Sequence, residues 1–284
     1  MGYKHKTYFC RMRYLKLIFD FYINASIHVA LSVYAFIRIT EAYFSLNNNS
    51  DLNCFIFFGT ITGYNFVKYA GVAKLHHRSL TKGLKNIQVF SFFSFLVLCY
   101  LGFQLTFKTI LYTIPFLLLT VLYAVPFLSG FEKNLRAISY LKIIVVAIVW
   151  AAFSVLIPIV DVNEAISLDV VLLMIQRFLI VIVLILPFDI RDVRFDAISL
   201  QTIPKKIGIK KTKKLGLLLL VISMLLEYFI STNVSIKTPF MFFFFLTIIF
   251  LMRTKTNQTK YFSSFWVESL PIVWWLILLG FHNF

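Results

Sequence analysis

Three aspartates in the second half of the chain are the strongest candidates for chemistry. Asp189, Asp192 and Asp196 are spaced three and four residues apart, so a helix would present their carboxylates on one face. Like charges repel there, and a divalent cation such as Mg²⁺ would neutralise them, because hard cations bind carboxylate oxygens. The neighbouring Arg191 and Arg194 offer a second interpretation, in which they pair with the aspartates in a solvated charged turn. The spacing alone leaves both interpretations open.

The aspartates follow a long apolar segment, one of many in the chain. Hydrophobic residues make up 60% of the sequence and charged residues 14%, which is more apolar than a soluble globular protein. The apolar blocks are about 17 to 23 residues long, enough for a helix to cross about 30 Å of hydrocarbon. The sequence therefore predicts an all-α integral membrane protein with nine spanning helices, near 16–40, 52–70, 87–107, 110–129, 141–160, 168–188, 215–231, 238–252 and 264–282.

Basic residues divide unevenly between the two sets of loops. Of the 28 Lys and Arg residues, 24 fall at the N-terminus or after the second, fourth, sixth and eighth predicted helices. The alternate loops contain Arg38, Lys108 and Lys237. Because cytoplasmic loops collect Lys and Arg, the N-terminus and the aspartate-bearing loop are predicted inside and the C-terminus outside. The formal net charge of +16 then reflects topology and contact with anionic membrane lipids rather than nucleic-acid binding.

Two charged residues lie inside predicted spans. Arg177 falls within 168–188 and Glu227 within 215–231. Intramembrane charges can mark a transport pathway, or they can snorkel or pair across neighbouring helices. A transporter is therefore one function class that the sequence leaves open.

Two segments resemble the UbiA superfamily of intramembrane prenyltransferases. Asp189-Ile-Arg-Asp-Val-Arg-Phe-Asp196, followed by Gln201-Thr-Ile-Pro-Lys-Lys-Ile-Gly208, is similar to the superfamily's second aspartate-rich motif. Leu122-Tyr123-Ala-Val-Pro126 and Leu135-Arg-Ala-Ile-Ser-Tyr-Leu-Lys142, running into the apolar segment 145–150, resemble the loop between its fourth and fifth helices. Nine helices with the N-terminus inside is also the superfamily's architecture. The resemblance covers nearly the whole chain and implies a single domain over residues 1–284.

The resemblance implies a central cavity in which an isoprenoid chain passes from a prenyl diphosphate to a hydrophobic acceptor, either an aromatic compound or a lipid. In the superfamily, two aspartate-rich motifs face each other across the cavity and hold Mg²⁺ against the diphosphate. Departure of the diphosphate leaves an allylic cation, which the acceptor captures. For this chain the resemblance therefore implies Mg²⁺ at Asp189, Asp192 and Asp196.

The first aspartate-rich motif departs from the superfamily's pattern. Asn65 stands at its start, but its three aspartate positions hold Phe66, Tyr69 and Ala73. Two hypotheses follow. In the first, basic side chains bind the diphosphate directly, replacing the metal that the absent carboxylates would hold. In the second, the fold keeps its cavity without the ionisation chemistry, which leaves a non-catalytic isoprenoid- or quinone-binding protein or a partner of another membrane enzyme.

The candidate site residues fall into two further groups. The residues expected to bind diphosphate are Lys142, Lys68, Lys74, Arg78 and Arg191. The residues expected to position the substrates are Asn65, Tyr123 and Tyr140.

Overall fold

The computed structural model describes residues 15–73, 82–124, 139–194 and 202–282, and among these it contains helices and connecting loops without a strand. Within the described residues, each predicted span overlaps a long helix or helices that follow one another in the chain. The helices are Leu15–Asn24, α2 (Ile27–Phe44), α3 (Ser50–Ala73), α4 (Lys82–Gly102), α5 (Phe107–Ala124), α6 (Ser139–Ala151), α7 (Ile157–Asp161), α8 (Leu168–Asp192), α9 (Ile203–Ile207), α10 (Ile209–Phe229), α11 (Val234–Arg253) and α12 (Leu270–His282), with π-helical turns η2 (Ala152–Leu156) and η3 (Phe262–Val267) before α7 and α12.

Length and hydropathy identify the chain as a multi-pass membrane protein. Six described helices or helix runs are long and apolar enough to cross a membrane. The pair Leu15–Asn24 and α2, bent by 59°, makes a seventh if it forms one span. Helices α3 and α10 fall outside this set, and α10 has four lysines among its first six residues. The count of nine spans therefore stays a prediction.

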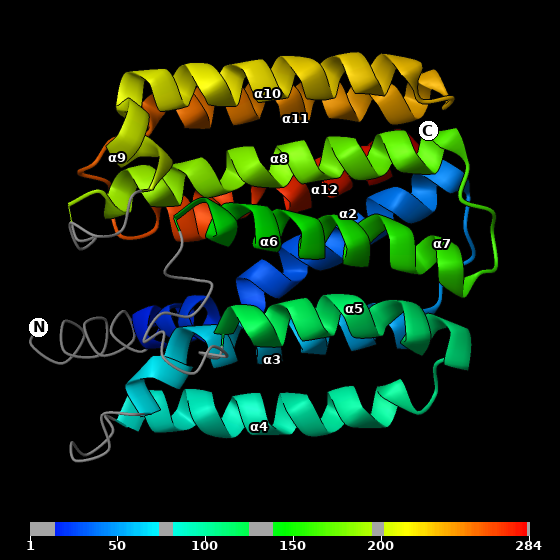
Figure 1. Ribbon diagram of the computed structural model, residues 1–284, viewed down its shortest axis with the longest axis horizontal. Coiled ribbons are helices and arrows are strands. Elements are labelled where there is room, and N and C mark those ends of the chain that lie inside the picture. The colour runs from blue at the N-terminus through cyan, green and yellow to red at the C-terminus, as the bar shows by residue number, and fades with distance from the viewer. Residues whose placement is uncertain (1–14, 74–81, 125–138, 195–201, 283–284) are drawn as a thin grey trace, which may run out of the picture.

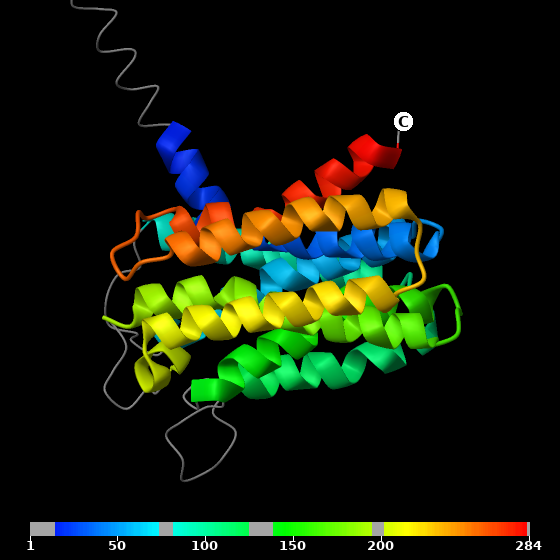
Figure 2. The ribbon, with the colours of Figure 1, turned by 90° about the horizontal axis from the view of Figure 1, so that it is seen from above.

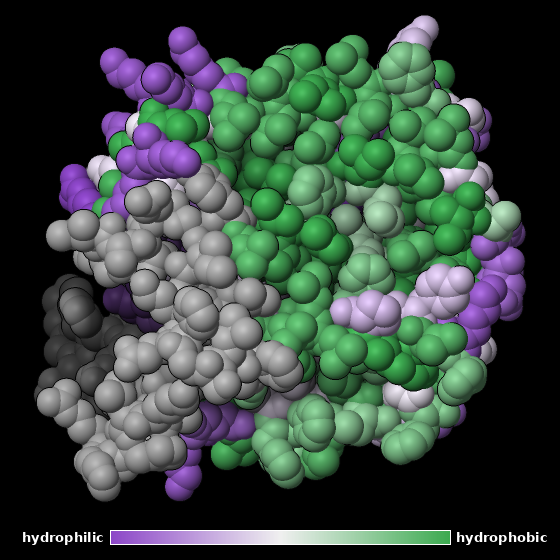
Figure 3. All heavy atoms as spheres, in the orientation of Figure 1, coloured by the Kyte–Doolittle hydropathy of each residue, from purple (hydrophilic) through white to green (hydrophobic). Residues whose placement is uncertain are grey.

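The longer helices run along a common direction and form a bundle (Figures 1 and 2). Helix α8 packs against α6 on one side and α10 on the other, while α2 lies between α3 and α12. Helix α4 packs against α3. Apolar side chains cover the middle of the face seen in Figure 3, and hydrophilic ones gather at its two ends. This distribution matches a bundle whose middle faces hydrocarbon.

Arg177 and Glu227 lie in the interior of the bundle. The guanidinium of Arg177 lies 4.1 Å from the ring centroid of Phe36 and 4.9 Å from that of Trp274. Glu227 accepts hydrogen bonds of 2.7 Å from Tyr43 Oη and from Gln176 Nε2. Neither charged residue lines the large cavity described below. Their surroundings correspond to a cross-helix polar cluster rather than to the wall of a transport pathway.

The helix termini that flank the basic loops lie at one end of the bundle. The end of α3, the start of α6, the end of α8 and the start of α10 share the left end in Figure 1, whereas the C-terminus lies at the opposite end. We refer to the first as the basic end. We expect this end to face the cytoplasm. A reporter fused after Phe284 should be exposed outside, and one inserted at Lys210 should be inside. Both reporters on the same side would contradict the nine-span arrangement.

Candidate functional site

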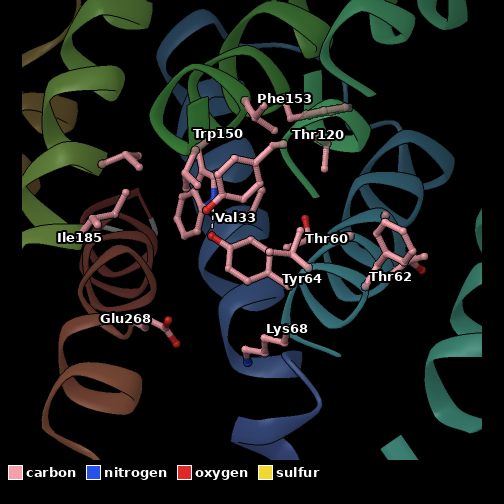
Figure 4. A pocket seen from close by; sticks show the side chains of 18 of the residues that line it. Val33, Thr60, Thr62, Tyr64, Lys68, Thr120, Trp150, Phe153, Ile185 and Glu268 are labelled. Carbon is pink, nitrogen blue, oxygen red and sulfur yellow. Dashed lines mark hydrogen bonds between the residues drawn. The ribbon is translucent and has the colours of Figure 1, made fainter. Parts of the chain in front are cut away.

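A cavity of about 990 Å³ opens among the helices, at the upper end of the usual range for ligand pockets. Its walls are largely apolar and aromatic, with Trp150, Phe153 and Ile185 on one side and α3 on another (Figure 4). Its charged lining residues stand near the helix termini of the basic end. They are Lys68, Lys142, Arg191, Asp192, Lys260 and Glu268.

The second motif begins on the last turns of α8, where Asp189 is fully buried. Its Oδ1 forms an ion pair with Lys142 Nζ at 3.1 Å. The Lys142 side chain is 27% exposed and lines the cavity. Gln258 Nε2 donates a 2.9 Å hydrogen bond to the carbonyl oxygen of Pro187, inside the same helix. The ion pair between Lys142 and Asp189 joins two predicted site residues, Asp189 from the metal group and Lys142 from the diphosphate group.

Asp192 stands at the end of α8 and lines the cavity. Arg191 forms a bidentate salt bridge with Asp192, in which Nε donates to Oδ1 at 2.7 Å and Nη2 donates to Oδ2 at 3.2 Å. The Arg191 guanidinium also lies 5.2 Å from the ring centroid of Phe188. Arg191 and Asp192 are therefore paired, as the second interpretation of the sequence proposed. The third aspartate, Asp196, lies outside the described residues.

The described aspartates do not fit a carboxylate cage for magnesium. Asp189 and Asp192 each have a basic partner. On the facing wall, Phe66 lines the cavity where the superfamily's pattern has a carboxylate. Within the ranges that the structure describes, no three His, Cys, Asp or Glu side chains group together to hold a metal ion.

Asn65 ties three helices together beside the cavity. It is 2% exposed, and its Nδ2 donates to the carbonyl oxygen of Ala25 at 3.0 Å and to Ser91 Oγ at 2.8 Å. Its Oδ1 accepts a 2.8 Å hydrogen bond from Ser26 Oγ, and Ser26 Oγ in turn accepts a 2.9 Å hydrogen bond from Lys68 Nζ. Asn65 is therefore placed to orient Lys68 through Ser26.

Ser26 lies at the bend before α2, where its φ of 63° places it in the left-handed region. The buried hydrogen bond to Asn65 helps hold this strained conformation, because a buried hydroxyl requires a partner. The bend, Asn65 and Lys68 thus form one unit at the basic end of the cavity.

Most of the basic lining residues already have a carboxylate partner. Lys142 pairs with Asp189, and Arg191 pairs with Asp192. Lys260 pairs with Asp20, and this hydrogen bond raises the pKa of Lys260 above its usual value. Lys68 differs, because among the described residues it donates its hydrogen bond to the hydroxyl of Ser26 rather than to a carboxylate.

Two features of the cavity were not predicted from the sequence. Trp150 Nε1 donates a 2.8 Å hydrogen bond to Tyr64 Oη, which links α6 to α3 across the aromatic wall. Glu268 projects into the cavity from the segment between η3 and α12 (Figure 4). A signal for Glu268 was present, because it is a lone acidic residue inside the predicted span 264–282, where a charge is costly.

Of the remaining predicted site residues, one lines the cavity and the others fall partly or wholly outside the described residues. Tyr123 is buried and lines the cavity. Tyr140 belongs to α6, but its side chain lies outside the described part of the chain, as do the residues Lys74 and Arg78. The substrate-binding roles of all these residues stay predictions.

No protein-family model matches the chain, and no curated protein matches its sequence. Solved structures of a UbiA homolog from Archaeoglobus fulgidus are similar to it. The form bound to GPP and Mg²⁺ has a TM-score of 0.60 at 12% identity, over 92% of this chain and all of the other. The form bound to DMAPP and Mg²⁺ has a TM-score of 0.59 at 11% identity, covering 92% and 99% of the two chains. The protein therefore has the UbiA fold, as its sequence segments predicted.

Proposed function

We propose that the protein is an intramembrane prenyltransferase of the UbiA superfamily, which transfers an isoprenoid chain from a prenyl diphosphate to a hydrophobic acceptor. One observation carries this proposal: the UbiA fold encloses a large cavity with apolar walls and a basic end. A prenyl diphosphate has the matching division into an apolar tail and an anionic head. The homolog structures bound to DMAPP and GPP support this choice of ligand class.

The apolar walls would hold the isoprenoid tail. Burial of each CH₂ group contributes about 0.8 kcal/mol, so the tail supplies most of the affinity in this part of the cavity. Trp150, Phe153 and Tyr64 present aromatic rings there. Aromatic faces attract cations, and these rings would stabilise an allylic cation while the apolar walls keep water away from it.

The basic end would hold the diphosphate. Lys68 can turn from the neutral Ser26 hydroxyl to a phosphate oxygen without leaving a carboxylate unpaired. Lys142 and Arg191 line the same space and add positive charge beside their aspartates. When the bond between C1 of the isoprenoid and the bridging oxygen breaks, the electron pair goes to the diphosphate. Fixed cations stabilise this developing charge.

Binding of the diphosphate by these basic side chains does not require magnesium. The described aspartates have basic partners, and the wall opposite them bears Phe66 and Lys68. Mg²⁺ bound by Asp189, Asp192 and Asp196 stays a prediction from the sequence resemblance. Direct binding of the diphosphate by basic side chains is the form of the activity that the described geometry favours.

A second candidate function is non-catalytic binding of an isoprenoid or quinone. The observation that favours it is Phe66, which extends the apolar lining into the position of a missing carboxylate. Such a protein would use the cavity walls in the same way, but it would not depend on the basic end.

Release of diphosphate separates the two candidates. The full chain in lipid nanodiscs is incubated with dimethylallyl, geranyl, farnesyl or geranylgeranyl diphosphate, and a membrane lipid extract supplies acceptors. We expect at least one donor to release inorganic diphosphate at a rate that Lys68→Met lowers about tenfold or more. The matched control is Lys237→Met, because Lys237 lies on the first turn of α11, away from the basic end. Tight binding of donors without any release would favour the non-catalytic binder.

A further inference from the structure

Glu268 is held in a defined position at the wall of the cavity. It follows the π-helical turn η3, and such turns are frequent at functional sites. Helix α2 secures this turn: His28 Nε2 donates a 2.9 Å hydrogen bond to the carbonyl oxygen of Phe265, and Ser32 Oγ donates to the carbonyl oxygen of Glu268 itself. The backbone of Glu268 is therefore anchored, while its side chain projects into the cavity (Figure 4).

Glu268 and Lys68 differ from the other charged residues of the cavity. Lys142, Arg191 and Lys260 each pair with an aspartate. Lys68 bonds to a hydroxyl, and the described residues provide no hydrogen-bond donor or ion-pair partner for the Glu268 carboxylate.

Lys68, from α3, and Glu268, from the segment between η3 and α12, both line the cavity, and Figure 4 shows their side chains entering it from different parts of the wall. Lys68 and Arg191 attract the Glu268 carboxylate from a distance, but a carboxylate without a hydrogen-bond donor is still costly in an apolar, membrane-embedded setting. We therefore expect a ligand to supply the missing donor.

We propose that Glu268 forms the acceptor subsite, where it accepts a hydrogen bond from the hydroxyl group of a neutral acceptor and takes its proton during transfer. This inference rests on the proposed prenyltransferase function. It assigns these two charged residues, which attract each other across the cavity without a direct ion pair, to the two substrates: Lys68 to the diphosphate and Glu268 to the hydroxyl compound.

The transfer step balances without an additional reactant. The acceptor oxygen forms a bond to C1 of the isoprenoid, and its proton moves to the Glu268 carboxylate. The bond between C1 and the diphosphate oxygen breaks, and its electron pair leaves with the diphosphate. The products are a prenyl ether, inorganic diphosphate and protonated Glu268, which returns its proton to solvent before the next cycle.

Charge also selects the class of acceptor. A bound diphosphate would occupy Lys68 and add its own negative charge, so the space beside Glu268 would be strongly negative. An anionic acceptor would be repelled there, whereas a neutral phenol or alcohol would donate a charge-assisted hydrogen bond. The subsite is therefore predicted to discriminate against carboxylates.

Binding of two simple probes tests this selectivity. The full chain in nanodiscs, saturated with geranyl S-thiolodiphosphate, is titrated with 1-naphthol and with 1-naphthoate, and binding to empty nanodiscs is subtracted. We expect the wild type to prefer naphthol by about tenfold or more. Glu268→Gln should reduce this preference to within about threefold, while Glu268→Asp should retain most of it. The control Glu164→Gln changes an exposed carboxylate on the α7–α8 loop and should behave as the wild type.

Hydrolysis of geranyl diphosphate, in which water serves as the acceptor, tests the proton transfer. Glu268→Gln should lower the rate of geraniol formation about 100-fold, while its affinity for the thiolodiphosphate stays within about threefold of the wild type. Equal rates in the two proteins, including no hydrolysis by either, would overturn the proton-acceptor role. A naphthol preference that survives Glu268→Gln, or a wild type that prefers naphthoate, would overturn the subsite.

Failure of the proposed function gives a different result. In that case the thiolodiphosphate does not bind the wild type, and the role of Glu268 is read from the difference in probe preference between the wild type and Glu268→Gln, both measured without diphosphate. A Lys68→Met protein with weakened thiolodiphosphate binding that keeps the naphthol preference at saturating thiolodiphosphate would support the division of charges between the substrates.

Discussion

Replacement of Lys68 by methionine should weaken binding of geranyl S-thiolodiphosphate by about 10- to 100-fold, because a hydrogen bond to a charged group is worth about 1.5 to 3 kcal/mol. The affinity for geraniol, which has the same tail without the diphosphate, should stay unchanged. Lys68 is the basic lining residue whose present partner is a hydroxyl rather than a carboxylate among the described contacts. Equilibrium binding of both ligands to the nanodisc-embedded protein provides the measurement.

Two control variants make the Lys68 result specific. Lys68→Arg keeps the positive charge and should retain most of the preference for the diphosphate. Asn65→Ala removes the acceptor of the Ser26 hydroxyl, so it should produce an intermediate loss if Asn65 orients Lys68 through Ser26. A Lys68→Met protein with wild-type affinity for the thiolodiphosphate would exclude this lysine from the diphosphate site.

Replacement of Glu227 by leucine should lower the free energy of unfolding by about 3 to 5 kcal/mol, since it leaves a buried positive charge without compensation. Arg177 is fully buried between Phe36 and Trp274, and its guanidinium has no hydrogen-bond acceptor among the described residues. Glu227 supplies an attractive charge nearby, and it also accepts hydrogen bonds from Tyr43 and Gln176.

The double variant Arg177→Met/Glu227→Leu tests whether the cost arises from charge. Removal of both charges by apolar residues of similar size should recover much of the lost stability. Denaturant unfolding of the purified proteins in detergent measures this difference. A double variant that is less stable than Glu227→Leu alone would show that Arg177 stabilises the bundle through its aromatic contacts rather than requiring a nearby anion.

The positions of the helices followed from composition, because each spanning segment must satisfy its backbone hydrogen bonds within itself and must be apolar along its length. This local rule located the long helices among the described residues, including those that contain Arg177 and Glu227. It could not fix the number of spans, since α3 and α10 carry polar residues that lower their hydropathy below that of the other helices.

The side-chain partners in the site were harder to predict, because they join residues that are distant in sequence. Asp189 was interpreted as a metal ligand from its spacing, but its partner Lys142 stands 47 positions earlier in the chain. Asn65 was predicted to position the substrates, and that role stays a prediction, but its hydrogen bond to Ser26 at the bend could not be predicted from the sequence. Glu268 was overlooked because a single carboxylate has no spacing to recognise, and its importance emerged from the cavity that surrounds it.

We expect the basic end of the cavity to recognise the diphosphate of an isoprenoid directly. The affinity of the wild-type protein for geranyl S-thiolodiphosphate relative to geraniol, measured with Mg²⁺ and again after removal of divalent metals by EDTA, tests this recognition. Direct recognition predicts a preference for the thiolodiphosphate of about tenfold or more, reduced by less than about fivefold in EDTA. Equal affinities for the two ligands, or a preference that disappears in EDTA, would contradict it.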